Sequence, residues 1–137
     1  MAIDSLDVLY LPSRDVEADV RFYRDTLGGR VIFAIEAMGT RVAEVALAQQ
    51  GPHVLLAQHL PADGAVLLHC VPALDQTLAE LEARGLRLEA RVELPIGSCA
   101  TFRCPGGQRL GVYELTRPQV YEHFAGRVDF GRQPEQP

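Results

Sequence analysis

Residues 15–29 read DVEADVRFYRDTLGG and follow an apolar segment from Leu6 to Leu11. The Asp15 carboxylate can accept hydrogen bonds from the free amides at a helix start, and Gly28-Gly29 can end the helix. Between them, an apolar stripe recurs at helical spacing: Val16, Val20, Tyr23 and Leu27. The sequence therefore predicts a strand over Leu6–Leu11 and an amphipathic helix over Asp15–Leu27.

The predicted order of strands and helix in the first half of the chain is repeated in the second half. Apolar segments between glycine and proline turns predict strands over Arg30–Ile35, Thr40–Ala48, His53–Gln58, Ala65–Val71, Arg87–Val92, Cys99–Arg103 and Arg109–Leu115. A second helix is predicted over Ala73–Arg84, and residues 59–64 link the halves. The chain thus contains two strand-helix-strand-strand-strand modules, at about 4–60 and about 65–116.

A single domain should extend over residues 1–130. Pro118 suits the first turn of a short terminal helix at about 117–125, and residues 131–137 are expected to be a disordered tail. With 137 residues and 47% hydrophobic content, the chain can bury one core but is short for two.

Composition excludes several classes of partner. A net charge of −5 leaves no basic face for nucleic acid, and no apolar run approaches the ~20 residues of a membrane span. The first residues lack the basic and apolar regions of a signal peptide. We therefore expect a cytoplasmic protein with no nucleic-acid or membrane partner.

The cysteines are odd in number, Cys70, Cys99 and Cys104, and none lies in a Cys-x-x-Cys pair. This usage is typical of free thiols in a reducing compartment. A disulfide or soft-metal clip between Cys99 and Cys104 is the alternative. We expect Cys104 to be the most accessible thiol, because it begins the turn Cys104-Pro105-Gly106-Gly107.

The order Asp15, then Phe22-Tyr23, then Leu27-Gly28 resembles the vicinal oxygen chelate superfamily. This group includes glyoxalases, extradiol dioxygenases, fosfomycin-resistance enzymes and bleomycin-binding proteins. The resemblance implies an α+β fold in which two βαβββ modules form a curved mixed sheet with a concave cleft, the site of the superfamily. It also implies a homodimer, because members of this length commonly pair modules across chains.

Metal-using members of the superfamily place four ligands around the metal. Each module supplies one ligand from its first strand and one from its last strand. The corresponding positions in this chain are Val8, Leu55, Val66 and Gly111, which have no side-chain donor. The resemblance therefore implies no metal or other cofactor. A metal held by His53, His59, Glu44 and a cysteine remains the alternative.

Side chains alternate along a strand, so the same register predicts the lining of the cleft. The candidate ligand-binding residues are Val8, Tyr10, His53, Leu55, Val66, Leu68, Cys70, Arg109, Gly111 and Tyr113. Gly111 would leave room where a ligating side chain would otherwise stand. An apolar bowl with a few polar groups suits a partly apolar small organic ligand.

The opposite register predicts the core under the two helices. It comprises Leu9, Leu11, Val54, Leu56, Leu67, Val71, Leu110 and Val112. His69 lies on this side, where a hydrogen-bonded structural histidine is expected rather than a catalytic one.

The sequence favours a binding protein with no catalytic residue that captures a small organic ligand in the cleft. The first alternative is a metal-dependent lyase or dioxygenase of the glyoxalase type with a non-standard ligand set. The second is metal-free acid/base or thiol chemistry by His53, Tyr10, Tyr113 or Cys70.

Overall fold

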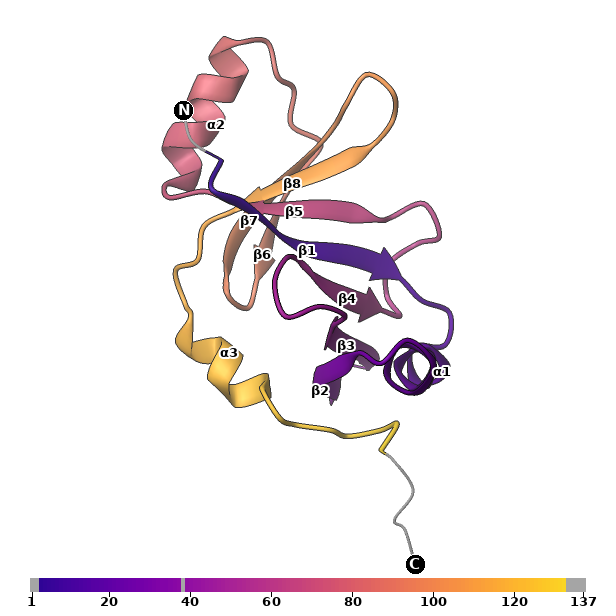
Figure 1. Ribbon diagram of the computed structural model, residues 1–137. Helices are drawn as coiled ribbons and strands as arrows, with labels where there is room; N and C mark the ends of the chain where they lie inside the picture. The colour runs from indigo at the N-terminus through magenta and orange to yellow at the C-terminus, as the bar shows by residue number, and fades with distance from the viewer. Residues whose placement is uncertain (1–2, 38, 133–137) are drawn as a thin grey trace, which may run out of the picture.

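The computed structural model describes residues 3–37 and 39–132 and contains one curved eight-stranded sheet with the order β2-β3-β4-β1-β5-β8-β7-β6 (Figure 1). The strands are β1 (Ser5–Pro12), β2 (Arg30–Ala37), β3 (Thr40–Ala46), β4 (His53–Ala57), β5 (Val66–Cys70), β6 (Ala90–Leu94), β7 (Gly97–Arg103) and β8 (Arg109–Tyr113). The helices are α1 (Val16–Arg21), a π-helical segment η1 (Phe22–Thr26), α2 (Leu74–Ala83) and α3 (Gln119–Phe124). This arrangement confirms the predicted α+β fold of two βαβββ modules.

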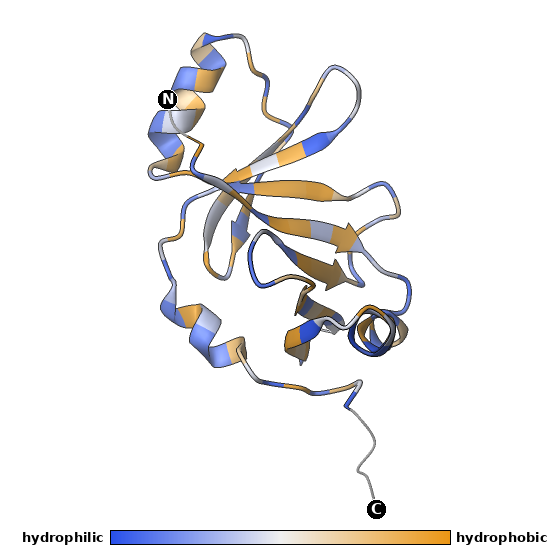
Figure 2. Ribbon diagram, viewed as in Figure 1, coloured by the Kyte–Doolittle hydropathy of each residue, from blue (hydrophilic) through white to orange (hydrophobic). Residues whose placement is uncertain are grey.

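The two modules meet at the centre of the sheet. Strand β1 pairs in parallel with β4 of its own module and antiparallel with β5 of the second module. Strand β5 in turn pairs in parallel with β8. The four strands that carry the candidate site are therefore adjacent, and β1, β4 and β5 are largely hydrophobic (Figure 2).

Local sequence explains how the first helix begins and changes form. The Asp15 carboxylate accepts a hydrogen bond from the amide of Ala18 at 3.0 Å, as the capping pattern predicts. The helix then widens, because the Leu27 amide bonds the Phe22 carbonyl five residues earlier at 3.1 Å. The predicted helix Asp15–Leu27 is thus continued by a π-helical turn.

Two apolar clusters lie between the sheet and the helices. The first joins Val16 and Val20 of α1 to Val54 and Leu56, and the second joins Leu74 and Leu78 of α2 to Val71 and Val112. This confirms the predicted core-facing register, except that Leu67 stays 37% exposed. His69 is half-buried, and its Nδ1 lies 3.1 Å from the Leu67 carbonyl oxygen.

The strand predicted over Arg87–Val92 begins later, at Ala90. Leu86 and Leu88 precede it and pack against the α2 cluster from an irregular segment. Their apolar spacing reflects contact with a helix rather than strand alternation, so the prediction of this strand's start was wrong.

The C-terminal segment crosses the open edge of β2 (Figure 1). The Ala34 amide bonds the Arg127 carbonyl at 2.9 Å, and the Asp129 amide bonds the Ala34 carbonyl at 2.7 Å. Phe130 is buried against the α1 cluster, and Gly131 accepts a hydrogen bond from Arg24. Packing therefore continues to Gly131, within the predicted tail, whereas residues 133–137 of that tail lie outside the described part of the chain. Among the described residues, no helix is long and apolar enough to cross a membrane.

The three thiols differ in their surroundings, and a labelling prediction follows. Cys99 is buried, which raises its pKa to about 11, and burial followed by the Asp7 charge raises the pKa of Cys70. Cys104 is half-buried in the predicted turn, which the Gly107 amide closes onto the Cys104 carbonyl at 2.9 Å. A thiol reagent on native protein should label Cys104 first and Cys99 last, because thiolate is the reactive form. Mass spectrometry of labelled peptides, with Cys104→Ser as the control, checks this order; equal slow labelling of all three would contradict it.

Candidate functional site

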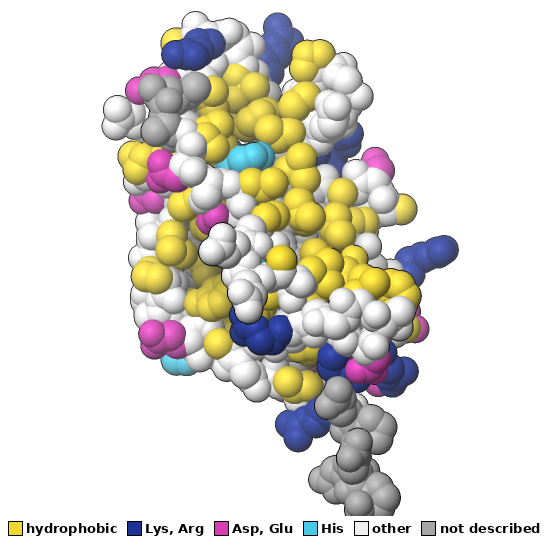
Figure 3. Space-filling view, viewed as in Figure 1, with side chains coloured by type: hydrophobic (Ala, Val, Ile, Leu, Met, Phe, Trp, Pro, Cys, Tyr) yellow, Lys and Arg dark blue, Asp and Glu magenta, His cyan; other side chains and the backbone are white. Residues whose placement is uncertain are grey.

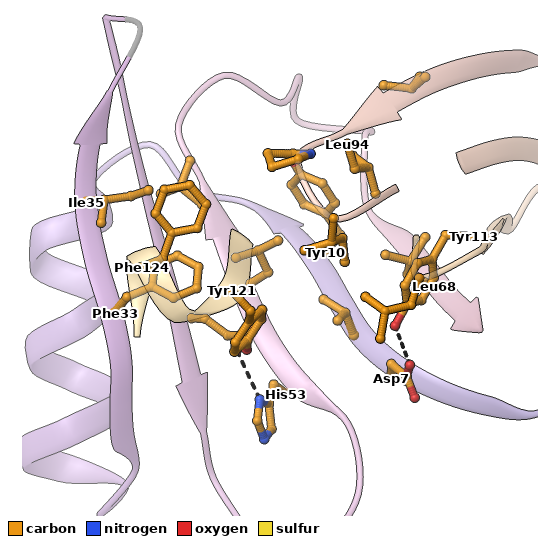
Figure 4. A pocket seen from close by; sticks show the side chains of 18 of the residues that line it. Asp7, Tyr10, Phe33, Ile35, His53, Leu68, Leu94, Tyr113, Tyr121 and Phe124 are labelled. Carbon is orange, nitrogen blue, oxygen red and sulfur yellow. Dashed lines mark hydrogen bonds and ion pairs between the residues drawn. The ribbon is translucent and has the colours of Figure 1, made fainter. Parts of the chain in front are cut away.

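The concave side of the sheet holds a cavity of about 770 Å³. Its walls come from strands β1 to β6 and β8, from the β6–β7 turn and from α3, so both modules and the C-terminal segment contribute. Most of its lining is apolar (Figure 4). A cavity of this size and polarity is typical of sites for small organic molecules.

Six of the ten candidate residues line this cavity, and four do not. Those at the cavity are Val8, Tyr10, His53, Leu55, Leu68 and Tyr113. The residues that do not line it are Val66, Cys70, Arg109 and Gly111.

The space beside Gly111 is filled by its neighbours. A Cβ atom built on Gly111 would lie 2.8 Å from Leu68 Cδ1 and 3.1 Å from Val66 Cγ1. The expectation that Gly111 leaves room in the cleft was therefore wrong. The Leu68 side chain covers this position and lines the cavity, so Gly111 does not reach the cavity.

Arg109 lies within an ion-pair cluster at the start of β8 rather than at the cavity. Its Nε donates to Glu89 at 2.7 Å, and its Nη1 donates to the Asp63 carbonyl at 3.1 Å. Hydrogen bonds from Arg109 and Arg103 lower the pKa of Glu89 from 4.5 to about 2. Arg109 therefore holds the β6 side of module two against the linker.

This cluster predicts an acid titration. Because the folded-state pKa of Glu89 is depressed, its stabilising effect should be present above pH 4.5 and lost as pH falls through about 2. The substitution Arg109→Gln should move the NMR titration midpoint of the Glu89 carboxyl upward. Arg91→Gln, which removes a partner of Asp75, is the control and should leave that midpoint in place. An unchanged midpoint in Arg109→Gln would contradict the assignment.

The first polar group of the cavity is the pair of Asp7 and Tyr113. The Tyr113 hydroxyl donates to Asp7 Oδ2 at 2.5 Å (Figure 4). Burial, and then this hydrogen bond, raise the pKa of Tyr113, so the phenol stays protonated.

The second polar group is the pair of Glu44 and His53. Glu44 is only 3% exposed, and its Oε2 lies 3.1 Å from His53 Nδ1. Burial raises the pKa of Glu44, and the interaction with His53 opposes this rise. A carboxyl and an imidazole in contact at a cavity wall can exchange a proton.

The third polar group joins Tyr10 to the linker. Its hydroxyl lies 2.8 Å from His59 Nε2, and Thr40 Oγ1 lies 3.5 Å from His59 Nδ1. Burial raises the pKa of Tyr10. The pair can therefore present a protonated hydroxyl and an imidazole to a ligand.

Aromatic side chains close the cavity on the side of module one (Figure 4). Phe33 of β2 packs against Tyr121 and Phe124 of α3, with ring centroids 6.2 and 5.7 Å apart. The sequence interpretation did not include these residues. Phe33 could have been predicted by extending the cleft register across the sheet. It pairs with Glu44 on β3, and Glu44 pairs with the predicted cleft residue Leu55 on β4. The placement of α3 depends on long-range packing with no local signal.

A metal does not fit this site. The residues that the resemblance places at the superfamily's metal positions, Val8, Leu55, Val66 and Gly111, offer aliphatic carbon or no side chain, and Val66 and Gly111 do not line the cavity. Over residues 3–37 and 39–132, no group of three or more His, Cys, Asp or Glu side chains is placed to hold an ion. The alternative set of His53, His59, Glu44 and a cysteine does not come together.

Comparison with solved structures gives the same fold. Methylmalonyl-CoA epimerase from Mycobacterium tuberculosis is 20% identical, with a TM-score of 0.66 over 88% of this chain and 96% of that chain. Methylmalonyl-CoA epimerase from Streptomyces coelicolor is 15% identical, with a TM-score of 0.68 over 84% and 99%. A hypothetical protein from Bacillus halodurans is 13% identical, with a TM-score of 0.67 over 80% and 93%.

Comparison of sequences gives the family. No curated protein matches the chain. The model of the glyoxalase/bleomycin resistance protein/dioxygenase superfamily matches residues 5–110, which include β1 through the start of β8. The chain belongs to the glyoxalase/bleomycin resistance protein/dioxygenase superfamily.

Proposed function

We propose that this protein binds a partly apolar small organic ligand in the cavity between its modules, without a metal ion. The observation that carries the proposal is the lining, in which aliphatic and aromatic side chains surround about 770 Å³. The absence of side-chain donors at Val8, Leu55, Val66 and Gly111, which the resemblance places at the superfamily's metal positions, supports it. Burying apolar surface contributes roughly 25 cal/mol per Å², so such a lining can supply affinity by itself.

The polar groups fit this role as orienting contacts. Tyr113, His53 and Tyr10 each place a hydrogen-bonding atom at the cavity within a preformed pair. Groups held in this way lose little freedom when a ligand binds. They can therefore select the orientation of a ligand whose body is held by the apolar walls.

Native mass spectrometry of protein purified without added metal, combined with elemental analysis, tests the proposal. A co-purifying organic compound without stoichiometric metal supports capture of a ligand. Stoichiometric zinc, nickel, manganese or iron would contradict it. For titrations we choose a neutral two-ring probe, 2-(1-naphthyl)ethanol, which should bind in one-to-one ratio by calorimetry.

A second candidate function is proton transfer by Glu44 and His53. The buried carboxyl of Glu44, with its raised pKa, lies against an imidazole at the cavity wall, as a general base requires. In D₂O, wild type should then exchange the α-hydrogens of small carbonyl compounds, and Glu44→Gln should not. NMR with a panel of ketones and thioesters measures this; exchange that survives in Glu44→Gln would exclude the pair as the base.

We also propose a homodimer. Hydrophobic side chains gather over the central strands on the face seen in Figure 3. Leu67 of the central strand β5 pairs with Leu9 and Leu110 yet remains 37% exposed. A second copy would remove this surface from water. Light scattering should give twice 15.0 kDa at micromolar concentration, and the mass of a monomer would contradict this prediction.

A further inference from the structure

Asp7 reaches the cavity through an irregularity in β1. Leu6 pairs with His69, and Val8 pairs with the adjacent residue Leu68, so Asp7 is the extra residue of a β-bulge. A bulge breaks the alternation of side chains and redirects one of them. Asp7 therefore lines the same cavity as Val8, although strict alternation would place them on opposite faces.

Neutral groups hold the Asp7 carboxylate. Ser5 Oγ donates to Oδ1 at 2.6 Å, and the Tyr113 hydroxyl donates to Oδ2 at 2.5 Å. Each carboxylate oxygen can accept a further hydrogen bond. None of the ion pairs found in the described part of the chain includes Asp7.

The other acidic groups at the cavity have partners of their own. Glu44 is paired with His53, and Glu93 accepts a hydrogen bond from Arg117 at 2.5 Å. The cavity-lining residues include no lysine or arginine. No cation among the cavity-lining residues therefore offsets the charge of the Asp7 carboxylate. This carboxylate is half-buried in a largely apolar cavity.

We infer that Asp7 binds a cationic group, a protonated amine or guanidinium, on the apolar ligand of this cavity. The inference rests on the proposed function and specifies the chemical class of its ligand. A ligand cation would form charge-assisted hydrogen bonds with the free lone pairs of Asp7. Its apolar body would lie against Val8, Leu55 and Leu68. An anionic ligand would meet carboxylates without a lining cation to offset its charge.

Three matched probes test the inference by calorimetry on the full chain at low ionic strength. They are 2-(1-naphthyl)ethylamine, which is cationic, 2-(1-naphthyl)ethanol, which is neutral, and 1-naphthaleneacetic acid, which is anionic. The amine should bind about tenfold more tightly than the alcohol, and the acid should bind most weakly. Equal affinity of the amine and the alcohol, or a preference for the acid, would overturn the inference while leaving ligand capture intact. Absence of binding by all three would overturn capture itself and the inference with it.

The variant Asp7→Asn locates the effect. It keeps the size of the side chain and a carbonyl acceptor for Tyr113, so the variant should fold, which thermal melts confirm. Its amine-to-alcohol affinity ratio should fall to about one, with alcohol affinity retained. Glu93→Gln is the matched control, since the Glu93 charge is already paired with Arg117, and it should keep the wild-type ratio. A ratio that survives in Asp7→Asn, or disappears in Glu93→Gln, would overturn the assignment to Asp7.

Discussion

Leu55→Arg should weaken binding of 2-(1-naphthyl)ethanol by about thirtyfold or more. Leu55 lies on β4 at the cavity wall, and its partner on β3 is Glu44. An arginine at this position would fill apolar space with a charged chain, and loss of a buried apolar contact of this size costs about 2 kcal/mol. The neighbouring Glu44 carboxyl offers the guanidinium a partner, so the fold should persist.

The control for this variant is Leu27→Arg. Leu27 follows the π-helical segment η1, does not line the cavity and is 48% exposed. The same change in chemistry should leave probe affinity within about twofold, because exposed positions tolerate substitution. Calorimetric titration of both variants, each shown to be folded by circular dichroism, measures the difference. Equal loss in both variants would mean that the probe does not occupy the cavity.

Phe130→Ala should lower the free energy of unfolding by about 3–5 kcal/mol. The Phe130 ring is 7% exposed, packs against Val16 and Val20, and has the Arg41 guanidinium 4.8 Å from its centroid. Removing the ring leaves a hole in the module-one core and releases the segment that covers β2. Uncovered strand edges promote association, so aggregation should increase as well.

Phe22→Ala is the matched control for Phe130→Ala. The Phe22 ring is 50% exposed on the π-helical segment, so its loss should cost less than about 1 kcal/mol. Urea denaturation followed by circular dichroism compares the two variants. Similar losses would show that Phe130 does not anchor the C-terminal segment.

Strand alternation predicted the two faces of the sheet for most residues of its central strands. Val8 and Tyr10 line the cavity, whereas Leu56 and Val112 pack under the helices, as the period of two requires. The repeat of strand and helix signals also predicted the modules. Both predictions depend on local patterns that can be read directly from the sequence.

The remaining features depend on contacts that no local pattern encodes. The bulge at Asp7 follows from how β1 and β5 fit together, and it exposes a carboxylate that alternation assigns to the other face. A glycine at position 111 does not indicate from the sequence whether the Leu68 side chain fills the space beside it. Phe124 and α3 reach the cavity through the fold of the whole chain.

The central test is the titration of 2-(1-naphthyl)ethanol into the 137-residue chain after dialysis against EDTA, repeated with one equivalent of zinc added. We expect one-to-one binding with the same affinity in both titrations, because apolar walls and protein hydrogen bonds hold the ligand. Binding that is absent after EDTA and restored by zinc would contradict this expectation.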